Sequence, residues 1–299
     1  MKHLIIKVLL IVFTVNLSSA QAWMTNLEIA QKLALVQNKM VLMVWEETTK
    51  YPYPFYVKDD RGRTLLIQNL FEDETVTPLI WKHFVPVIIS ENQYADLYLE
   101  IKGKRNQSYI EKFNDDSIKI MDVNGNIINA SGYFDDFPNI TKLIEKYSLN
   151  TKFLELELAG YKKEKTFYSA YYLASKYLDY AMYCNEKIRP QIINLASLYL
   201  DEALIFVDTE TSEEKETLIE RVELLRIQQN LILKRPKKVL RQLKRIDIDT
   251  SKSNTASYVA FLYYTAYSIL EDEKKAKLWK AKTSSVNLKK AQMIINLNS

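Results

Sequence analysis

The sequence predicts a mixed α/β N-terminal part followed by an all-helical C-terminal part. Two continuous apolar runs of strand length, at 40–45 and 84–89, lie among helical patterns in the first half. After Gly160 the chain contains no glycine, and apolar residues recur every three or four positions. With 299 residues, 47% of them hydrophobic, the chain is long enough for two folded domains.

The first 22 residues have the form of a secretory signal peptide. Lys2 and Lys7 are basic, an apolar stretch covers 8–15, and small residues end the segment. The apolar stretch is too short for a transmembrane helix, which needs about 20 residues. We expect cleavage after Ala20 or Ala22, a secreted or periplasmic protein, and no transmembrane anchor after cleavage. The two domains are then expected at 23–150 and 151–299.

Charge and cysteine content exclude several function classes. The chain has 41 Lys+Arg and 37 Asp+Glu. Loss of Lys2 and Lys7 leaves 39 against 37, a net charge of +2, which gives no overall reason to bind nucleic acid. The single cysteine, Cys184, excludes an internal disulfide, a CxxC redox pair and a cysteine-based zinc site. On its helix we expect Cys184 to pack as a small buried hydrophobe.

The N-terminal elements follow from capping and periodicity. Thr25 and Glu28 have the spacing of a capping box, which predicts a helix that ends at Asn38-Lys39. The run 40–45 is apolar throughout, as in a strand covered on both faces. A second helix is predicted over 73–83, and 84–89 follows it as a second strand.

A hairpin and a helix complete this part. The Asn-Gly pair at 124–125 predicts a tight turn between strands at 117–121 and 126–129. The pattern at 140–147 predicts a helix.

The segment 23–149 resembles a thioredoxin-fold domain of the secreted kind. The order helix, strand, helix, strand, hairpin and final helix carries the resemblance, together with four short motifs: Asn38-Lys39, Phe84-Val85-Pro86-Val87, Asp122-x-x-Gly125 and Gly132-Tyr133. Such a domain implies a low-pKa cysteine after the first strand and a second cysteine three residues later.

The residues that this chemistry requires are replaced. In the register of 40–45 the dithiol positions fall on Lys50-Tyr51-Pro52-Tyr53, where Lys50 and Tyr53 stand in place of the cysteines. The cis-proline of the family falls near Asp116, and no proline lies between Pro86 and Pro138. The resemblance therefore implies a fold that is kept and a thiol-disulfide exchange that is lost, with no catalytic residue left at these positions.

The stretch after this site departs from the family. Residues 55–57 and 64–67 predict two strands around the turn Asp59-Asp60-Arg61-Gly62, an inserted hairpin where the family has a helix. The hairpin brings aromatic side chains to the vacated edge as a possible binding surface: Tyr51, Tyr53, Phe55 and Tyr56. The alternative is that these rings pack the hairpin onto the sheet.

The apolar periodicity of the C-terminal half predicts six amphipathic helices joined by polar turns. The sixth is broken near Ser284-Ser285. The stretches 173–181 and 195–203 agree at seven of nine positions. Small alanines between large Leu and Tyr residues resemble the packing of tetratricopeptide repeats, although the offset of 22 residues differs from their period of about 34. One helix echoing its neighbour, or chance, also explains the match.

Charge is segregated in this half. Acidic residues between Glu213 and Glu223 precede basic residues between Lys234 and Arg245. Two neighbouring helices of opposite sign predict a solvated, mutually paired face. The alternative is a docking strip for an anionic partner or lipid surface, with Lys237, Lys238 and Arg241 as its candidates.

Enzyme signatures are absent from the sequence. The mature chain has one histidine, His83, at a predicted helix end, and it contains no phosphate loop or dinucleotide fingerprint. We expect no metal and no cofactor. The sequence favours an exported, non-catalytic adaptor or chaperone-like factor that binds a protein partner. The alternatives are an enzyme of unrecognised class, an accessory protein that works with a partner's cysteines, and a purely structural envelope protein.

Overall fold

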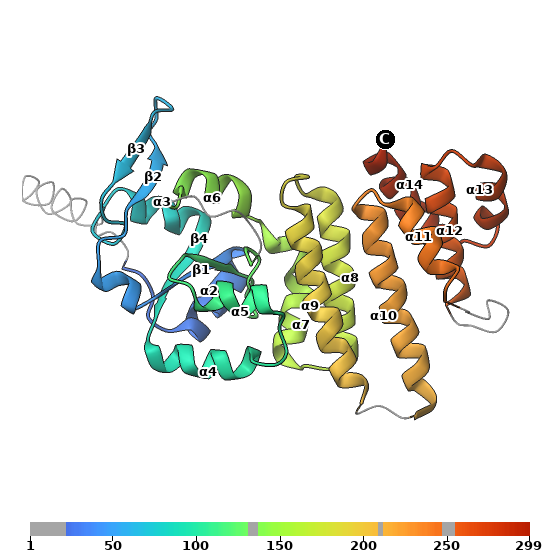
Figure 1. Cartoon of the computed structure of the whole chain (residues 1–299), viewed down its shortest axis with the longest axis horizontal. Coiled ribbons are helices and arrows are strands. Elements are labelled where there is room, and N and C mark those ends of the chain that lie inside the picture. Colours follow the sequence, from blue (N-terminus) through green and yellow to red (C-terminus); the bar gives the residue numbers. More distant parts are fainter. Residues whose placement is uncertain (1–21, 131–136, 209–211, 247–254) are drawn as a thin grey trace, which may run out of the picture. The chain divides into compact units, whose positions relative to one another are not determined.

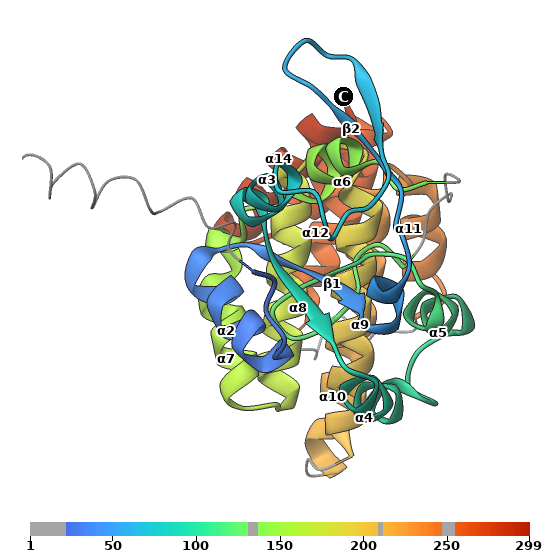
Figure 2. The same ribbon diagram turned by 90° about the vertical axis from the view of Figure 1, so that its left-hand side faces the viewer.

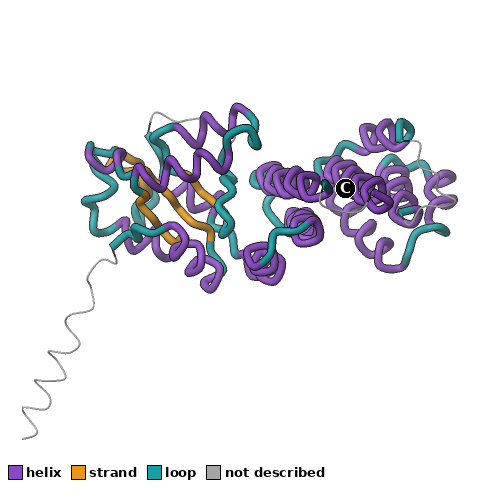
Figure 3. The backbone as a smooth tube through the Cα atoms, turned by 90° about the horizontal axis from the view of Figure 1, so that it is seen from below, coloured by secondary structure: helices purple, strands orange, loops and turns teal. Residues whose placement is uncertain are grey.

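The structure, a computed structural model, describes residues 22–130, 137–208, 212–246 and 255–299. The expected signal peptide up to residue 21 and the Gly132-Tyr133 motif lie outside these residues. The chain divides into two compact units, one of residues 22–121 and 137–149, the other of 122–130 and the described residues from 150 onward. Among the described residues the strands lie in the first unit and the second unit is helical, as the sequence predicts (Figure 3).

A three-stranded sheet forms the core of the first unit (Figure 1). Its central strand β1 (Met40–Trp45) runs parallel to β4 (Phe84–Ile89) and antiparallel to β5 (Lys119–Met121). Every residue of β1 is buried, which explains why the run is apolar throughout. Helix α2 (Leu27–Gln37) packs against β1 and β4.

The first two predicted helices of this unit form, with shifted N-termini. The N-cap of α2 is Asn26, whose side chain accepts a hydrogen bond from the amide of Ile29, so the prediction of Thr25 as N-cap is wrong by one residue. Helix α3 (Val76–His83) begins three residues later than predicted. Asp73, the predicted start, instead accepts from the amides of Thr75 and Val76.

The predicted hairpin is confirmed. Strands β2 (Phe55–Lys58) and β3 (Thr64–Ile67) pair antiparallel as a separate two-stranded sheet. Asp59 fixes the turn by accepting hydrogen bonds from the amides of Arg61 and Arg63. Figures 1 and 2 show that the turn end extends beyond the helices and sheet of this unit.

This unit differs from the prediction in two additional helices and in one predicted strand that does not form. Helices α4 (Glu91–Ile101) and α5 (Gln107–Asn114) fill the segment between β4 and β5, for which the sequence pattern predicts no element. Helix α4 carries apolar residues at helical spacing, Tyr94, Leu97, Tyr98 and Ile101, but they are only half-buried, and the helix has no fully buried residue. The described residues 126–129 form no named strand, and the predicted second hairpin strand is wrong. Helix α6 (Ile140–Tyr147) forms as predicted.

The second unit consists of packed helices. The six predicted helical patterns correspond to α8 to α14, because the sixth pattern is broken at Ser284 as predicted. The turn η2 (Thr151–Leu154) and helix α7 precede them without having been predicted. The bounds are α7 Glu155–Lys163, α8 Phe167–Tyr183, α9 Arg189–Val207, α10 Ser212–Ile232, α11 Pro236–Leu243, α12 Ala256–Ile269, α13 Glu273–Lys280 and α14 Ser285–Asn298.

Helix α9 has an unusual composition. Within the described part of the chain it is the one helix whose length and apolar character match a membrane-crossing segment. It packs against α8, and Leu195, Ala196 and Leu200 are among its fully buried residues. A core helix has the same composition, so this match is weak evidence for a membrane span.

Candidate functional site

The candidate site is the sheet edge at the carboxyl end of β1. Because β5 is antiparallel to β1, the segment that enters β5 meets the segment that leaves β1 at this edge. The predicted dithiol positions, 50–53, and the predicted cis-proline position, Asp116, both lie in these segments. Topology therefore brings to one edge the two segments that the sequence pattern singles out.

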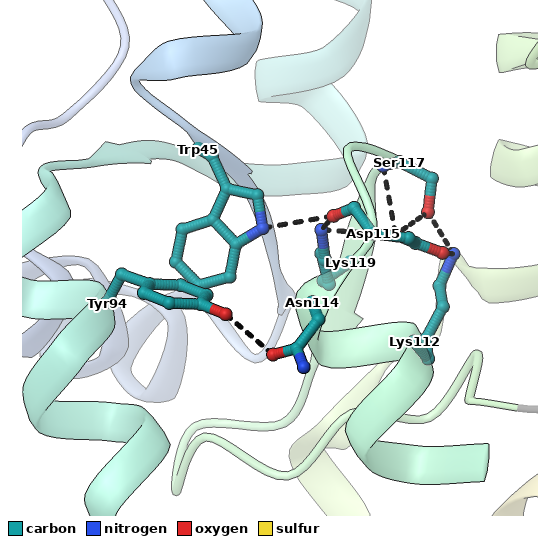
Figure 4. A network of polar contacts seen from close by, with 7 residues as sticks. All are labelled: Trp45, Tyr94, Lys112, Asn114, Asp115, Ser117 and Lys119. Atoms are coloured by element: carbon teal, nitrogen blue, oxygen red, sulfur yellow. Dashed lines mark hydrogen bonds and ion pairs between the residues drawn. The ribbon is translucent and has the colours of Figure 1, made fainter.

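A charged cluster organises the segment before β5 (Figure 4). The carboxylate of Asp115 lies 3.4 Å from Nζ of Lys112 and 3.2 Å from Nζ of Lys119. Asp115 also accepts hydrogen bonds from the amide and the hydroxyl of Ser117, at 2.9 and 2.5 Å. Lys112 and Lys119 are both buried, so one partly exposed carboxylate serves two buried ammonium groups.

Aromatic side chains hold the same segment from the side of β1. The indole Nε1 of Trp45 donates a 3.0 Å hydrogen bond to the backbone oxygen of Asp115. Nζ of Lys119 lies 4.9 Å from the centroid of the Trp45 ring, within the range of a cation–π contact. The hydroxyl of Tyr94, on α4, donates to Asn114 at 2.6 Å (Figure 4). The turn before β5 is thus fixed by ionic and aromatic contacts.

Burial and charge shift the pKa values of this cluster in opposite ways. Burial lowers the pKa of Lys119 to about 8, although Asp115 partly offsets it. Burial also lowers the pKa of Lys112. For Asp115, burial acts to raise the pKa, but the Ser117 hydroxyl and the two ammonium groups keep it below its usual value. The fully buried Lys119 is out of reach of a substrate, so the cluster acts as a structural clamp.

Sequence reasoning missed this cluster. A usable signal was present, because Lys119 interrupts the apolar run Ile118-Lys-Ile-Met121 that enters the core. A charged residue inside a buried strand needs a partner, and Asp115 is the acid four residues before it.

The four predicted dithiol positions occupy different environments. Lys50 is exposed and pairs with Glu47 at 2.5 Å in the short helix η1 (Glu47–Lys50). Tyr51 is 66% exposed, and Pro52 is also exposed. Tyr53 is turned inward: burial raises its pKa to about 12, while a backbone hydrogen bond from Ile118 acts the other way. Tyr53 therefore reaches the segment before β5, and Lys50 does not.

The predicted aromatic surface is reduced to one ring. Phe55 is fully buried, so its assignment to an exposed surface is wrong. Tyr53 packs against Phe71 with ring centroids 5.8 Å apart, and Tyr56 lies 6.0 Å from Phe137. These rings attach the hairpin to the first unit, and Tyr51 alone of the four stays largely exposed.

The other candidate residues are His83 and Cys184. Nδ1 of His83 lies 2.8 Å from the Ser148 hydroxyl. Burial and the neighbouring charges of Lys82 and Lys39 lower the pKa of His83, which disfavours the imidazolium that a catalytic base must form. Cys184 is half-buried, and burial raises its pKa. Within the described ranges, no three His, Cys, Asp or Glu side chains are grouped to hold a metal.

The predicted pairing of acidic and basic helices is not seen in the described residues. Lys237, Lys238 and Arg241 on α11 are exposed, and none of them makes an ion pair with a carboxylate of the described part. The side chains of Glu213 and Glu214 lie outside the described residues. Glu220, on α10, accepts a hydrogen bond from Thr255.

Comparisons with known proteins return no relative: no family model, no curated protein and no solved structure matches the chain.

Proposed function

We propose that the protein is an exported, non-catalytic binding protein whose first unit is a thioredoxin-like domain without thiol chemistry. The observation that carries the proposal is the state of the sheet edge at the end of β1. Lys50 points to solvent in an ion pair, Tyr53 is turned inward, and Asp115 locks the opposing segment. No thiolate is available at this edge to attack a disulfide, since the one cysteine of the chain, at position 184, belongs to the second unit.

Binding is proposed for the β2–β3 hairpin, at the position where the thioredoxin family has a helix. Leu65 and Leu66 on β3 are 40% and 44% exposed, and neighbouring residues of a strand point to opposite faces. In the described residues β3 pairs with β2 alone, so its outer edge is open to a further strand. An extended polypeptide segment with apolar side chains fits this chemistry, because main-chain pairing supplies affinity and side chains supply selectivity.

Photo-crosslinking tests the binding surface. A photoreactive amino acid is placed at Leu66 in the full-length chain, and crosslinked species from the native envelope are identified by mass spectrometry. We expect a specific protein partner, lost when Leu65→Ser is added. The matched control carries the same photoreactive residue at Leu99, an equally apolar side chain that is 69% exposed on α4. Equal capture from both positions would contradict a specific surface.

Insulin reduction tests the absence of thiol chemistry. We expect no turnover by the purified mature protein with dithiothreitol as reductant above the rate of dithiothreitol alone. Turnover that persists in Cys184→Ser would refute the non-catalytic proposal, because no thiol would remain in the chain. Turnover that depends on Cys184 would instead identify a mixed-disulfide role for that residue.

Export is tested at the N-terminus of the protein recovered from cells. Mass spectrometry of the secreted or periplasmic fraction should find a chain that begins at Gln21 or Trp23. Recovery of the intact N-terminus in the cytoplasm would contradict export and leave the binding proposal in place.

A further inference from the structure

Helix α11 presents a basic face that the fold does not use. Val239 and Leu243 are buried and attach the helix to the core of the second unit. At about 100° per residue, Lys237, Lys238 and Arg241 fall within an arc of about 100° on the opposite side of the helix. Lys244 and Arg245 follow in the turn that ends the helix. These five cations, here called the α11 face, are all exposed.

The charges of the α11 face are not neutralised within the described chain. Some other cations of the second unit do have carboxylate partners: Lys290 pairs with Asp179 at 2.7 Å, and Lys176 with Glu157 at 3.5 Å. For the five cations of the α11 face no such pair occurs with any described carboxylate. The face therefore projects a positive field into solvent.

The whole C-terminal end strengthens this field. Residues 234–299 contain 15 Lys+Arg and 5 Asp+Glu, whereas residues 23–233 contain 24 and 32. The mature chain is close to neutral only because these two parts cancel. Helices α11, α13 and α14 all pack against α12, whose sequence Ala256–Ile269 holds no charged residue, so the positive charge is carried around one apolar helix.

We propose that the α11 face docks the protein onto the surface of a bilayer that contains anionic phospholipid. Each Lys or Arg near such a surface is attracted to the negative headgroups, and a short helix with its cations on one side matches a flat array of phosphates. The buried side of α11 keeps the helix attached to the second unit. The contact is electrostatic and peripheral, and no segment has to cross the membrane.

The composition of the face favours lipid over the other anionic partners. It has no aromatic side chain on which a nucleic-acid base could stack. It also has no apolar centre surrounded by a polar rim, the arrangement of a stable protein–protein interface. The proposed export serves only to bring the protein next to a membrane, and a test with purified components does not depend on it.

Vesicle flotation tests the proposal. The purified mature protein is mixed with phosphatidylethanolamine vesicles that contain phosphatidylglycerol, and with phosphatidylcholine vesicles as the neutral probe. We expect binding to the anionic vesicles only, weakened by added salt as the Debye length shortens. The triple variant Lys237→Ala, Lys238→Ala, Arg241→Ala should bind about a hundred-fold more weakly at low salt.

A second triple variant separates the face from total charge. Lys58→Ala, Arg61→Ala and Lys82→Ala remove three exposed cations from the first unit. This variant should bind the anionic vesicles as the unsubstituted protein does, and circular dichroism verifies that both variants keep their helices. An equal loss in the two variants would overturn the proposal, because only net charge would matter.

Three further results would overturn it. One is equal binding to neutral and anionic vesicles, and another is anionic-vesicle binding that is unchanged in the α11 variant. The third is a salt-sensitive dimer, seen by light scattering without lipid and abolished in the α11 variant, which would assign the face to a second copy of the chain. None of these outcomes bears on the insulin or crosslinking tests of the proposed function.

Discussion

Tyr177 and Tyr199 stack with ring centroids 5.6 Å apart and donate their hydroxyls to the same carboxylate oxygen, Oδ2 of Asp122. The two tyrosines occupy equivalent positions in the sequence echo of α8 and α9. The other oxygen of Asp122 accepts from the amides of Asn124 and Asn126, each at 3.0 Å. The echo thus has a physical meaning, because each helix supplies one arm of a clamp on a fully buried acid.

This clamp predicts a graded response to substitution at Asp122. Asp122→Ala leaves two tyrosine hydroxyls and two amides without their acceptor, at a cost of roughly 1–3 kcal/mol for each group that stays buried. Asp122→Asn keeps an oxygen for the two amides and removes a charge whose burial is unfavourable, as the raised pKa of Asp122 indicates. We therefore expect Asp122→Ala to lose several kcal/mol of unfolding free energy and Asp122→Asn much less, measured by urea denaturation. A larger loss in Asp122→Asn than in Asp122→Ala would contradict this account.

The sequence predicts well those elements whose apolar residues mark the buried positions. The run Met40–Trp45 is buried along its whole length, and the breaks between α8 and α14 follow the loss of apolar periodicity. The prediction omits α4, whose apolar residues recur at helical spacing but are only half-buried. The prediction of a strand after the Asn-Gly turn is wrong for another reason. The residues after the turn belong to the helical unit, and the turn residues alone do not reveal such a long-range contact.

At the candidate site, too, the sequence predicts the local features and misses those that depend on long-range packing. The prediction placed Lys50 and Tyr53 just after β1, and this placement follows directly from their distance along the chain. Which of them faces solvent depends on the loop of Asp115 and on Phe71, residues 18 or more positions away. Tertiary packing therefore decided that Tyr53 turns inward and that Phe55 is not part of a surface.

Asp115 is predicted to be the residue on which the sheet edge depends. Asp115→Ala leaves the buried Lys112 and Lys119 without their shared carboxylate, and breaking such an ion pair costs about 3–5 kcal/mol. The adjacent Asp116 is exposed, and Asp116→Ala is the matched control, expected within about 0.5 kcal/mol of the unsubstituted protein. Both unfolding free energies are measured in urea. Similar values for the two variants would show that the lysines find other partners.

Cys184 is predicted to be a slow thiol in the folded protein. Burial raises its pKa, so a smaller fraction is thiolate near neutral pH than for a free cysteine, and the half-buried sulfur is shielded from reagents. We expect alkylation by iodoacetamide to be several-fold slower in the folded chain than in urea, followed by mass spectrometry. Equal rates in both states would mean that the helix end at Cys184 opens readily.

Stability is predicted to rise with pH on the alkaline side of neutrality. Burial holds the pKa of Lys119 at about 8 in the folded state, against 10.5 for an unperturbed lysine. Between these values the unfolded chain binds more protons than the folded chain, so the unfolding free energy increases with pH. The gain from near pH 7 to near pH 9.5 is about 2 kcal/mol. Above about pH 10 the trend reverses, because Tyr53 and Tyr147, with pKa values raised to about 12, ionise more readily when unfolded.

Substitution separates this contribution from those of the other groups. Lys119→Met removes the buried titrating group and should flatten the rise between about pH 7 and pH 9.5, measured as urea-denaturation free energies at each pH. Lys32→Met is the control, because Lys32 is an exposed lysine paired with Glu28 at 2.6 Å on the surface of α2, and it should leave the slope unchanged. A rise that persists in Lys119→Met would assign the pH dependence to other groups, with Lys112 as the first to test because its pKa is also lowered by burial. If the rise in unfolding free energy is lost in both variants, net charge explains it, and the burial of Lys119 does not.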